Sequence, residues 1–138
     1  DLEIIEHNTS TASVDEAALA HSVKPGQIVK TIALMLDTPI LLMVAGDTKI
    51  DNKKYKNTFK KKAKMLSGEQ TEEFTSHPIG GVCPFGLPSK LSVYADISID
   101  NYDFVIPAAG SGNSSVIIEK NRLLEIVSAT KVDVTVPK

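Results

Sequence analysis

Lys30 is a charged residue in a stretch whose other residues predict a buried strand. Residues 27–36 are largely apolar on both alternating faces, which is typical of a central strand covered on two sides. A buried ammonium is costly unless it is paired or neutralised. Lys30 therefore has two interpretations. Either it reaches an edge or pairs with a carboxylate such as Asp47 or Asp96, or it projects into a pocket and meets an anionic or carbonyl oxygen of a ligand.

A glycine- and proline-rich segment at positions 80–86 could supply main-chain groups to a ligand. It reads Gly80-Gly81-Val82-Cys83-Pro84-Phe85-Gly86, in a chain with 8 glycines. Glycine permits positive φ and close approach, whereas proline fixes φ and removes an N–H donor, so we expect a shaped loop here. Its free N–H groups can point at a ligand, with Phe85 as an apolar anchor or wall. A tight connection with a buried phenylalanine is the alternative.

A second polar loop is predicted at residues 110–114, which read Gly-Ser-Gly-Asn-Ser. This is half of a dinucleotide-binding fingerprint, but a strand-like segment follows it. The helix N-terminus that would hold a pyrophosphate is therefore missing, and a Rossmann site is excluded. Main-chain N–H groups and the hydroxyls of Ser111 and Ser114 could still bind an anion or a developing oxyanion. A plain turn is the alternative.

The stretch from residue 52 to residue 64 is strongly basic. It holds seven of the 15 basic residues of the chain and no acidic residue. Such asymmetry suits a nucleic-acid phosphate backbone, with an affinity that falls steeply as salt is raised. The alternative is a solvated, lysine-rich helix face. Tyr55 and Phe59 interrupt the lysines, but they are expected in the core and not in base stacking.

Other chemistry is not indicated. Cys83 and His77 have no diagnostic spacing for a thiol nucleophile and its base, and a lone cysteine is usually a small buried hydrophobe. The three histidines have no ligand-like spacing among themselves or with Cys83, so no metal site is predicted. No cofactor is expected.

Composition indicates an ordinary globular domain. The chain has 138 residues, 42% of them hydrophobic and 23% charged, and a formal net charge of −2. No apolar run is long enough to cross a membrane. A single cysteine allows no internal disulfide, which fits the reducing cytoplasm. Because the net charge is slightly negative, nucleic-acid binding would have to depend on a local patch.

Apolar patterns and capping signals predict hairpins interleaved with helices. Strands are expected at residues 2–6, 27–36, 40–45, 91–95, 104–109, 115–118 and 132–136. Helices are expected after the capping boxes Ser13-x-x-Glu16 and Ser67-x-x-Gln70, after Asp51 with Tyr55, Phe59 and Ala63 on one face, and around Leu123, Leu124 and Val127. This order favours a single α+β domain over residues 1–138, with a mixed or antiparallel sheet.

Taken together, these motifs resemble the YbaK family. The motifs are Gln-Ile-Val-Lys in a strand, Val-Ala-Gly-Asp ending a hairpin, Gly-Gly-Val-x-Pro-Phe-Gly, and an Ala-Gly-Ser loop. They occur in this order from about Thr11 to Val134. The family comprises aminoacyl-tRNA deacylases and the inserted editing domain of bacterial prolyl-tRNA synthetases.

The resemblance implies a fold and an activity. The expected fold is a single α+β domain whose mixed, mostly antiparallel, barrel-like sheet is flanked by helices. The expected activity is hydrolysis of the ester that joins a wrong, small amino acid to the terminal adenosine of tRNA, usually proline tRNA. The expected partners are the acceptor end of tRNA and prolyl-tRNA synthetase.

The resemblance also implies roles for individual residues. Lys30 matches the family lysine, which contacts the substrate near the terminal phosphate and the ester, and Gly110 matches the glycine of the strand-end loop; these two are the candidate catalytic positions. The candidate substrate-binding residues are Thr31, Gly80, Gly81, Val82, Pro84, Phe85, Ser111 and Asn113. In two places the chain departs from family patterns. Ala108-Ala109 stands where some members carry a serine, and residues 111–114 lack the Lys-Arg-Gly-Leu run of the cysteine-specific branch.

Three functional hypotheses follow. The first is a stand-alone trans-editing hydrolase without a side-chain nucleophile, in which the basic stretch holds acceptor-stem phosphates. The second is a non-catalytic module that binds tRNA or a synthetase. The third is a thiol hydrolase using Cys83. The inferred tRNA-binding residues are Lys53, Lys54, Lys60 and Lys61.

Overall fold

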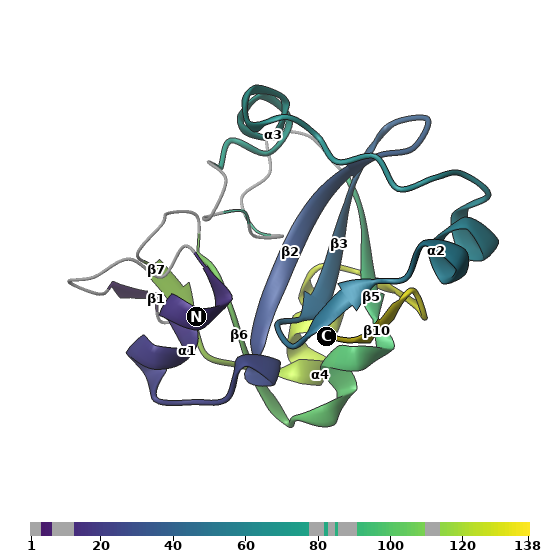
Figure 1. The fold of residues 1–138 in the computed structure, drawn as a ribbon. Coiled ribbons are helices and arrows are strands. Elements are labelled where there is room, and N and C mark those ends of the chain that lie inside the picture. The colour runs from purple at the N-terminus through teal and green to yellow at the C-terminus, as the bar shows by residue number, and fades with distance from the viewer. Residues whose placement is uncertain (1–3, 7–12, 78–81, 83–84, 86–90, 110–113) are drawn as a thin grey trace.

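A curved six-stranded sheet forms the centre of the computed structural model, which describes residues 4–6, 13–77, 82, 85, 91–109 and 114–138 (Figure 1). Its strand order is β8-β6-β2-β3-β5-β9. Two further two-stranded sheets pair β1 with β7 and β10 with β4. The strands are β1 (Ile4–Glu6), β2 (Ile28–Met35), β3 (Pro39–Ala45), β4 (Thr48–Ile50), β5 (Ser92–Asp96), β6 (Phe104–Pro107), β7 (Ser114–Val116), β8 (Ile118–Glu119), β9 (Thr130–Val132) and β10 (Thr135–Pro137).

The sheet is mixed. The β2–β3 hairpin is antiparallel, as are the pairs β6–β8, β1–β7 and β10–β4. Strands β2–β6, β3–β5 and β5–β9 run parallel. Over the described strands four pairs are antiparallel and three are parallel, and all three parallel pairs lie in the six-stranded sheet. The α+β class with a mixed sheet is confirmed.

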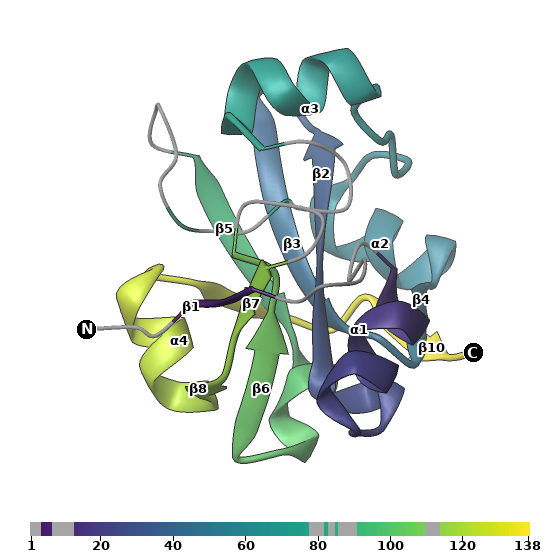
Figure 2. The same cartoon turned by 90° about the vertical axis from the view of Figure 1, so that its left-hand side faces the viewer.

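Four α-helices flank the sheet in the described part of the chain (Figure 2). They are α1 (Val14–His21), α2 (Asn52–Phe59), α3 (Gly68–Thr75) and α4 (Lys120–Ile126), with short 3₁₀ helices η1 (Pro25–Gln27) and η2 (Ile97–Asn101). The capping boxes at Ser13 and Ser67 and the N-cap at Asp51 are present, because each side chain accepts a hydrogen bond from an N–H of the first helical turn. All three predicted helix starts are therefore confirmed.

Both faces of β2 are covered, as its sequence predicts. Val29 and Ala33 join one core cluster with Leu41, Met43 and Val93. On the other face, Ile32 and Leu34 pack with residues of β3, with the fully buried Tyr55 and with Phe59. At the start of the strand, Ile28 packs against Ala17 and Ala18 of α1. Burial on both sides explains why the strand is apolar on both faces.

Strand β4 was not predicted, and several element boundaries differ from those expected. Helix α2 ends at Phe59 because Lys60 adopts φ 63, so Ala63 packs against the core from outside the helix. The strand expected at 115–118 is divided at Ile117 into β7 and β8, which pair with different strands. The strand expected at 132–136 is likewise divided, into β9 and β10.

Asp96 causes the second division. Its fully buried carboxylate accepts hydrogen bonds from Val134 N–H (2.7 Å), Thr135 Oγ1 (2.6 Å) and Ser98 N–H (2.9 Å). Burial alone would raise the pKa of Asp96, but these hydrogen bonds outweigh it and lower the pKa. The ionised carboxylate therefore ties the end of β5 to the start of β10.

We predict that Asp96→Asn lowers the free energy of unfolding at pH 7 by about 2–4 kcal/mol, because an amide leaves buried donors without acceptors. Since the pKa is lowered, this stabilisation is present above its ordinary value of 3.8 and is lost as the pH falls through the folded-state pKa. Urea unfolding should therefore show that the free energies of unfolding of the unaltered protein and of Asp96→Asn become equal in acid.

The matched control is Asp100→Asn. Asp100 pairs with Lys120 (3.3 Å) and Lys131 (2.5 Å) at the exposed surface. We expect this change to cost less than about 1 kcal/mol at pH 7. Equal losses for the two variants would contradict the structural role of Asp96.

Candidate functional site

One edge of β2 is open between two points of contact. The parallel ladder with β6 covers only Ile28 and Val29. Further along the same edge, Leu66 N–H donates to Ala33 O (3.0 Å) and Met35 N–H donates to Lys64 O (2.8 Å). Among the described residues, no strand pairs with this edge between those contacts. An unpaired edge presents free main-chain donors and acceptors.

The main chain of Thr31 faces this open edge. Even-numbered residues of β2 bond to β3, since Ile28 O accepts from Gly46 N–H (2.9 Å). Odd-numbered residues point the other way, as the bonds of Ala33 and Met35 show. By alternation, Thr31 presents its N–H and C=O at the gap.

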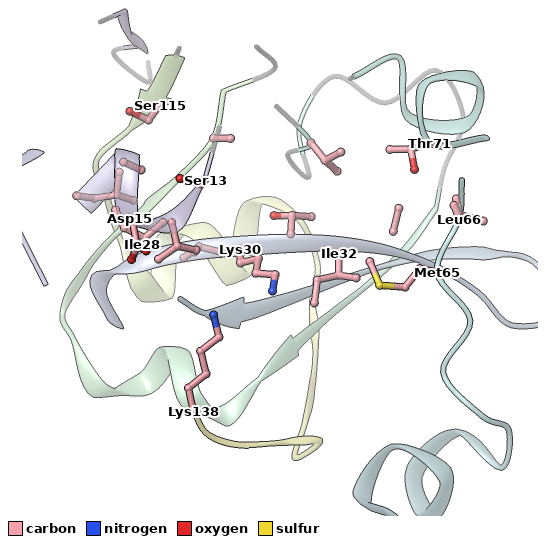
Figure 3. A pocket seen from close by; sticks show the side chains of 18 residues that line it. Ser13, Asp15, Ile28, Lys30, Ile32, Met65, Leu66, Thr71, Ser115 and Lys138 are labelled. Atoms are coloured by element: carbon pink, nitrogen blue, oxygen red, sulfur yellow. The ribbon is translucent and has the colours of Figure 1, made fainter. Parts of the chain in front are cut away.

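A cavity of about 420 Å³ lies around the open edge (Figure 3). It draws lining residues from both faces of β2, including Lys30 and Ile32 from one face and Thr31 and Ala33 from the other. Helix α1, the segment around Met65 and Leu66, and the end of the chain supply further walls. The cavity therefore combines an apolar lining with a few polar groups, which is the usual character of a small-molecule site.

Lys30 reaches this cavity without a carboxylate partner. Asp96 is occupied by Ser98, Val134 and Thr135, and no salt bridge joins Lys30 to any described acidic residue. Of the two alternatives for Lys30, the one in which it pairs with Asp47 or Asp96 is therefore wrong. Burial lowers the pKa of Lys30, and the nearby charge of Lys138 lowers it further. The amine is thus half-buried and available to a ligand.

Thr31 carries a buried polar atom that no described residue satisfies. Its Oγ1 is buried and has no hydrogen-bond partner among the described residues. A buried hydroxyl normally finds a partner, because leaving it unpaired costs free energy. Since Thr31 also lines the cavity, a bound ligand is the natural partner for this hydroxyl.

The glycine–proline segment reaches the same cavity at one described position. Val82 is buried and lines it. Phe85 instead packs against the core cluster that includes Val29, and its carbonyl lies 2.7 Å from His77 Nε2. Phe85 is thus an anchor of the segment. Gly80, Gly81, Cys83 and Pro84 lie outside the described residues.

Of the second loop, at residues 110–114, the structure describes Ser114 and the residues on either side of the loop. Ala108 and Ser115, on either side of residues 110–113, pair with each other and both line the cavity. Gly110, Ser111 and Asn113 lie outside the described residues. The segments that precede and follow this loop therefore meet Lys30 and Val82 at one site, although all are far apart in sequence.

The lysine-rich stretch divides into two sets. Lys54 pairs with Asp133 (3.1 Å) and also donates to Thr135 O (2.9 Å), while Lys61 pairs with Asp37 (2.5 Å). Three other lysines line a separate surface hollow together with Asn52 and Ala63; they are Lys53, Lys56 and Lys62. The stretch then continues into Met65 and Leu66, which are part of the first cavity wall.

Sequence analysis missed two features of the site. Lys138 lines the cavity from the last position of the chain, where no motif marks it. His21 and Ser115 are 94 residues apart in sequence, yet His21 Nε2 lies 2.6 Å from Ser115 Oγ. Lys138 and Ser115 line the cavity, whereas His21 lies behind Ser115 and is not part of the lining. Only the tertiary fold brings these residues together. Among the described residues there is no cluster of histidine, cysteine and acidic side chains that could hold a metal.

Comparison with known proteins identifies the family. The model of the aminoacyl-tRNA editing domain matches residues 8–126. The chain therefore belongs to the family of aminoacyl-tRNA editing domains, as its motifs indicate.

Individual relatives agree with this assignment. The chain is 43% identical over 138 residues to the uncharacterized protein YwhH of Bacillus subtilis (strain 168), covering 99% of this chain and 87% of that protein. It is 27% identical over 104 residues to the proline–tRNA ligase of Citrifermentans bemidjiense, covering 74% of this chain but only 18% of the ligase.

A solved structure has the same fold. It is described as that of a proposed trans-editing enzyme for prolyl tRNA synthetase, with a TM-score of 0.90 and 28% identity. The match covers 98% of this chain and 87% of that one. No helix in the described part of this chain is long and apolar enough to span a membrane.

We predict that Thr31→Val leaves the free energy of unfolding unchanged or raises it by up to about 1 kcal/mol, because the lost hydroxyl has no partner. The control is Thr75→Val. The Thr75 hydroxyl donates to Thr71 O at 2.6 Å, and its loss should cost about 1–2 kcal/mol. Urea unfolding measures both. Equal destabilisation by the two changes would show that the Thr31 hydroxyl has a structural partner.

Proposed function

We propose that this protein hydrolyses the ester bond of mischarged aminoacyl-tRNA, with proline tRNA carrying a small non-cognate amino acid as the expected substrate. The observation that carries the proposal is the unpaired, half-buried Lys30 in a cavity at the open edge of β2. Membership of the editing-domain family supports it. The likeness to the editing-enzyme structure and to proline–tRNA ligases supports the choice of tRNA.

The chemistry requires stabilisation of one developing negative charge. Water attacks the ester carbonyl, the carbonyl oxygen becomes an oxyanion, and collapse of the intermediate breaks the bond to the ribose oxygen, which leaves with a proton. In this proposal the Lys30 ammonium, which lines the cavity, faces that oxyanion, and the open-edge N–H of Thr31 acts as a second donor. Preorganised donors of this kind contribute about 3 kcal/mol each. An activated aminoacyl ester needs no side-chain nucleophile.

The remaining predicted residues complete the proposal. Gly110, Ser111 and Asn113 would supply further main-chain and polar contacts, and Gly80, Gly81 and Pro84 would close the pocket over the amino acid. Apolar walls at Ile32, Ala33 and Val82 suit a small side chain, and the Thr31 hydroxyl would help to select it. No cofactor enters the mechanism, and the expected location is the cytoplasm.

The main test uses Lys30→Met, which removes the ammonium but keeps an unbranched side chain. We expect kcat/KM for deacylation of mischarged proline tRNAs to fall about 10²–10³-fold, because the oxyanion loses its charged donor. Stability should not fall, because the ammonium has no ion-pair partner. Release of amino acid from tRNAs charged with a panel of small amino acids measures turnover.

Two controls separate the competing hypotheses. Lys49→Gln removes an exposed lysine on β4 and should leave turnover unchanged. Cys83→Ser should also retain activity, whereas a thiol hydrolase would lose it. Tight tRNA binding by the unaltered protein without turnover of any substrate would favour the non-catalytic binding module.

We further propose that the lysine-lined hollow contacts tRNA phosphates. Lys53, Lys56 and Lys62 share it, whereas Lys54 and Lys61 are already matched with aspartates. Of the four lysines inferred from sequence, Lys53 is therefore the best supported as a tRNA contact. Lys60 is exposed at the end of α2. Binding phosphate through Lys54 or Lys61 would require breaking an existing pair.

The combined change Lys53→Gln, Lys56→Gln and Lys62→Gln should weaken tRNA binding and reduce the slope of log K against log salt by about 2–3, at about 0.7–0.9 per lost phosphate contact. The matched control makes the same lysine-to-glutamine change at Lys54, Lys61 and Lys131, each of which is ion-paired. It should alter the slope by less than about 1. Filter binding over a salt series measures both. Equal slopes in the two variants would remove the hollow from the interface.

A further inference from the structure

Lys138 brings a second ammonium group to the cavity that contains Lys30. Strand β10 pairs with β4 so that Pro137 lies opposite Thr48, and Lys138 N–H donates to Asp47 O at 3.0 Å. These bonds fix the main chain of Lys138 beside the cavity. Figure 3 shows its side chain extending toward Lys30 from the opposite side, with the two amines directed at the same space.

The fold does not neutralise this pair of charges. Neither lysine forms a salt bridge with a described acidic residue. Asp15, at the start of α1, is the acidic residue among the described residues of the cavity lining, and it forms no ion pair with either lysine. Burial lowers the pKa of Lys30, and the nearby positive charge of Lys138 lowers it further. An anion between them would turn the repulsion into two attractions.

The resemblance to the YbaK family already implies that Lys30 lies near the phosphate of the terminal nucleotide. We propose that Lys138 supplies a second ammonium group to that phosphate. This inference rests on the proposed function and adds a positioning residue to it. An aminoacyl ester carries a free amino group and no carboxylate, so the anion nearest the reacting ester is the phosphodiester of the same terminal nucleotide. Phosphate oxygens can accept hydrogen bonds from two ammonium groups on different sides.

Exposure assigns different roles to the two lysines. Lys138 is exposed at the mouth of the cavity, whereas Lys30 is half-buried beside the open edge of β2. A nucleotide entering from solvent would meet Lys138 with its phosphate, leaving Lys30 within reach of both phosphate and ester. Lys138 is thus a positioning residue. It holds the nucleotide so that the ester faces Thr31 and Lys30.

The test compares binding of adenosine 5′-monophosphate and adenosine, two probes that differ only in the phosphate. The unaltered protein should bind the monophosphate more tightly. Lys138→Gln should reduce that preference about tenfold, the change expected for one charge-assisted hydrogen bond, while adenosine affinity stays the same. Lys138→Arg should restore it. NMR titration measures all of these affinities.

Lys49→Gln is the matched control, because it removes one positive charge from β4, the partner strand of β10. It should keep the preference for the monophosphate. Equal preference in Lys49→Gln and Lys138→Gln, or no preference in the unaltered protein, would overturn the inference. Because these assays require no turnover, a protein that binds the monophosphate through Lys138 but hydrolyses no aminoacyl-tRNA would contradict the proposed function alone.

Discussion

The open edge of β2 is the constraint on which the site depends. The strand is held along its whole length by β3, but on its other side the described residues hold it only at its two ends, through β6 and through the segment around Leu66. The residues between these contacts keep unused main-chain groups. Because the gap exposes both faces of the strand at once, neighbouring residues of opposite orientation, Lys30 and Thr31, can line a single cavity.

Two buried features keep that arrangement in place. The tight β2–β3 hairpin fixes the direction of each β2 side chain, with apolar clusters on both faces. The ionised Asp96 carboxylate binds the start of β10 through Val134 and Thr135. Strand β10 in turn pairs with β4 and carries Lys138 to the cavity. A carboxylate at the end of β5 thereby determines where a distant amine lies.

Electrostatics distinguish this cavity from the surface around it. Elsewhere, Lys54, Lys61 and Lys131 are paired with aspartates, so their charges are locally balanced. Within the cavity, Lys30 and Lys138 face each other without an ion-pair partner in the described part of the chain, and the Thr31 hydroxyl has no hydrogen-bond partner there either. Folding therefore leaves uncompensated polar groups in one place, and a ligand that carries negative charge and hydrogen-bonding atoms would compensate them.

The sequence by itself determined the class of fold, the helix starts and the position of Lys30 in a strand that is covered on both faces. Helix capping and the alternation of apolar side chains along a strand are local properties of the chain. Motif order also indicated the editing-domain family. Only the tertiary structure decided that Lys30 has no ion-pair partner among the described acidic residues, that Asp96 bonds to the chain between β9 and β10, that Lys54 and Lys61 are paired, and that Lys138 lines the cavity. Those outcomes depend on tertiary contacts between residues far apart in sequence, and no local sequence pattern specifies such contacts.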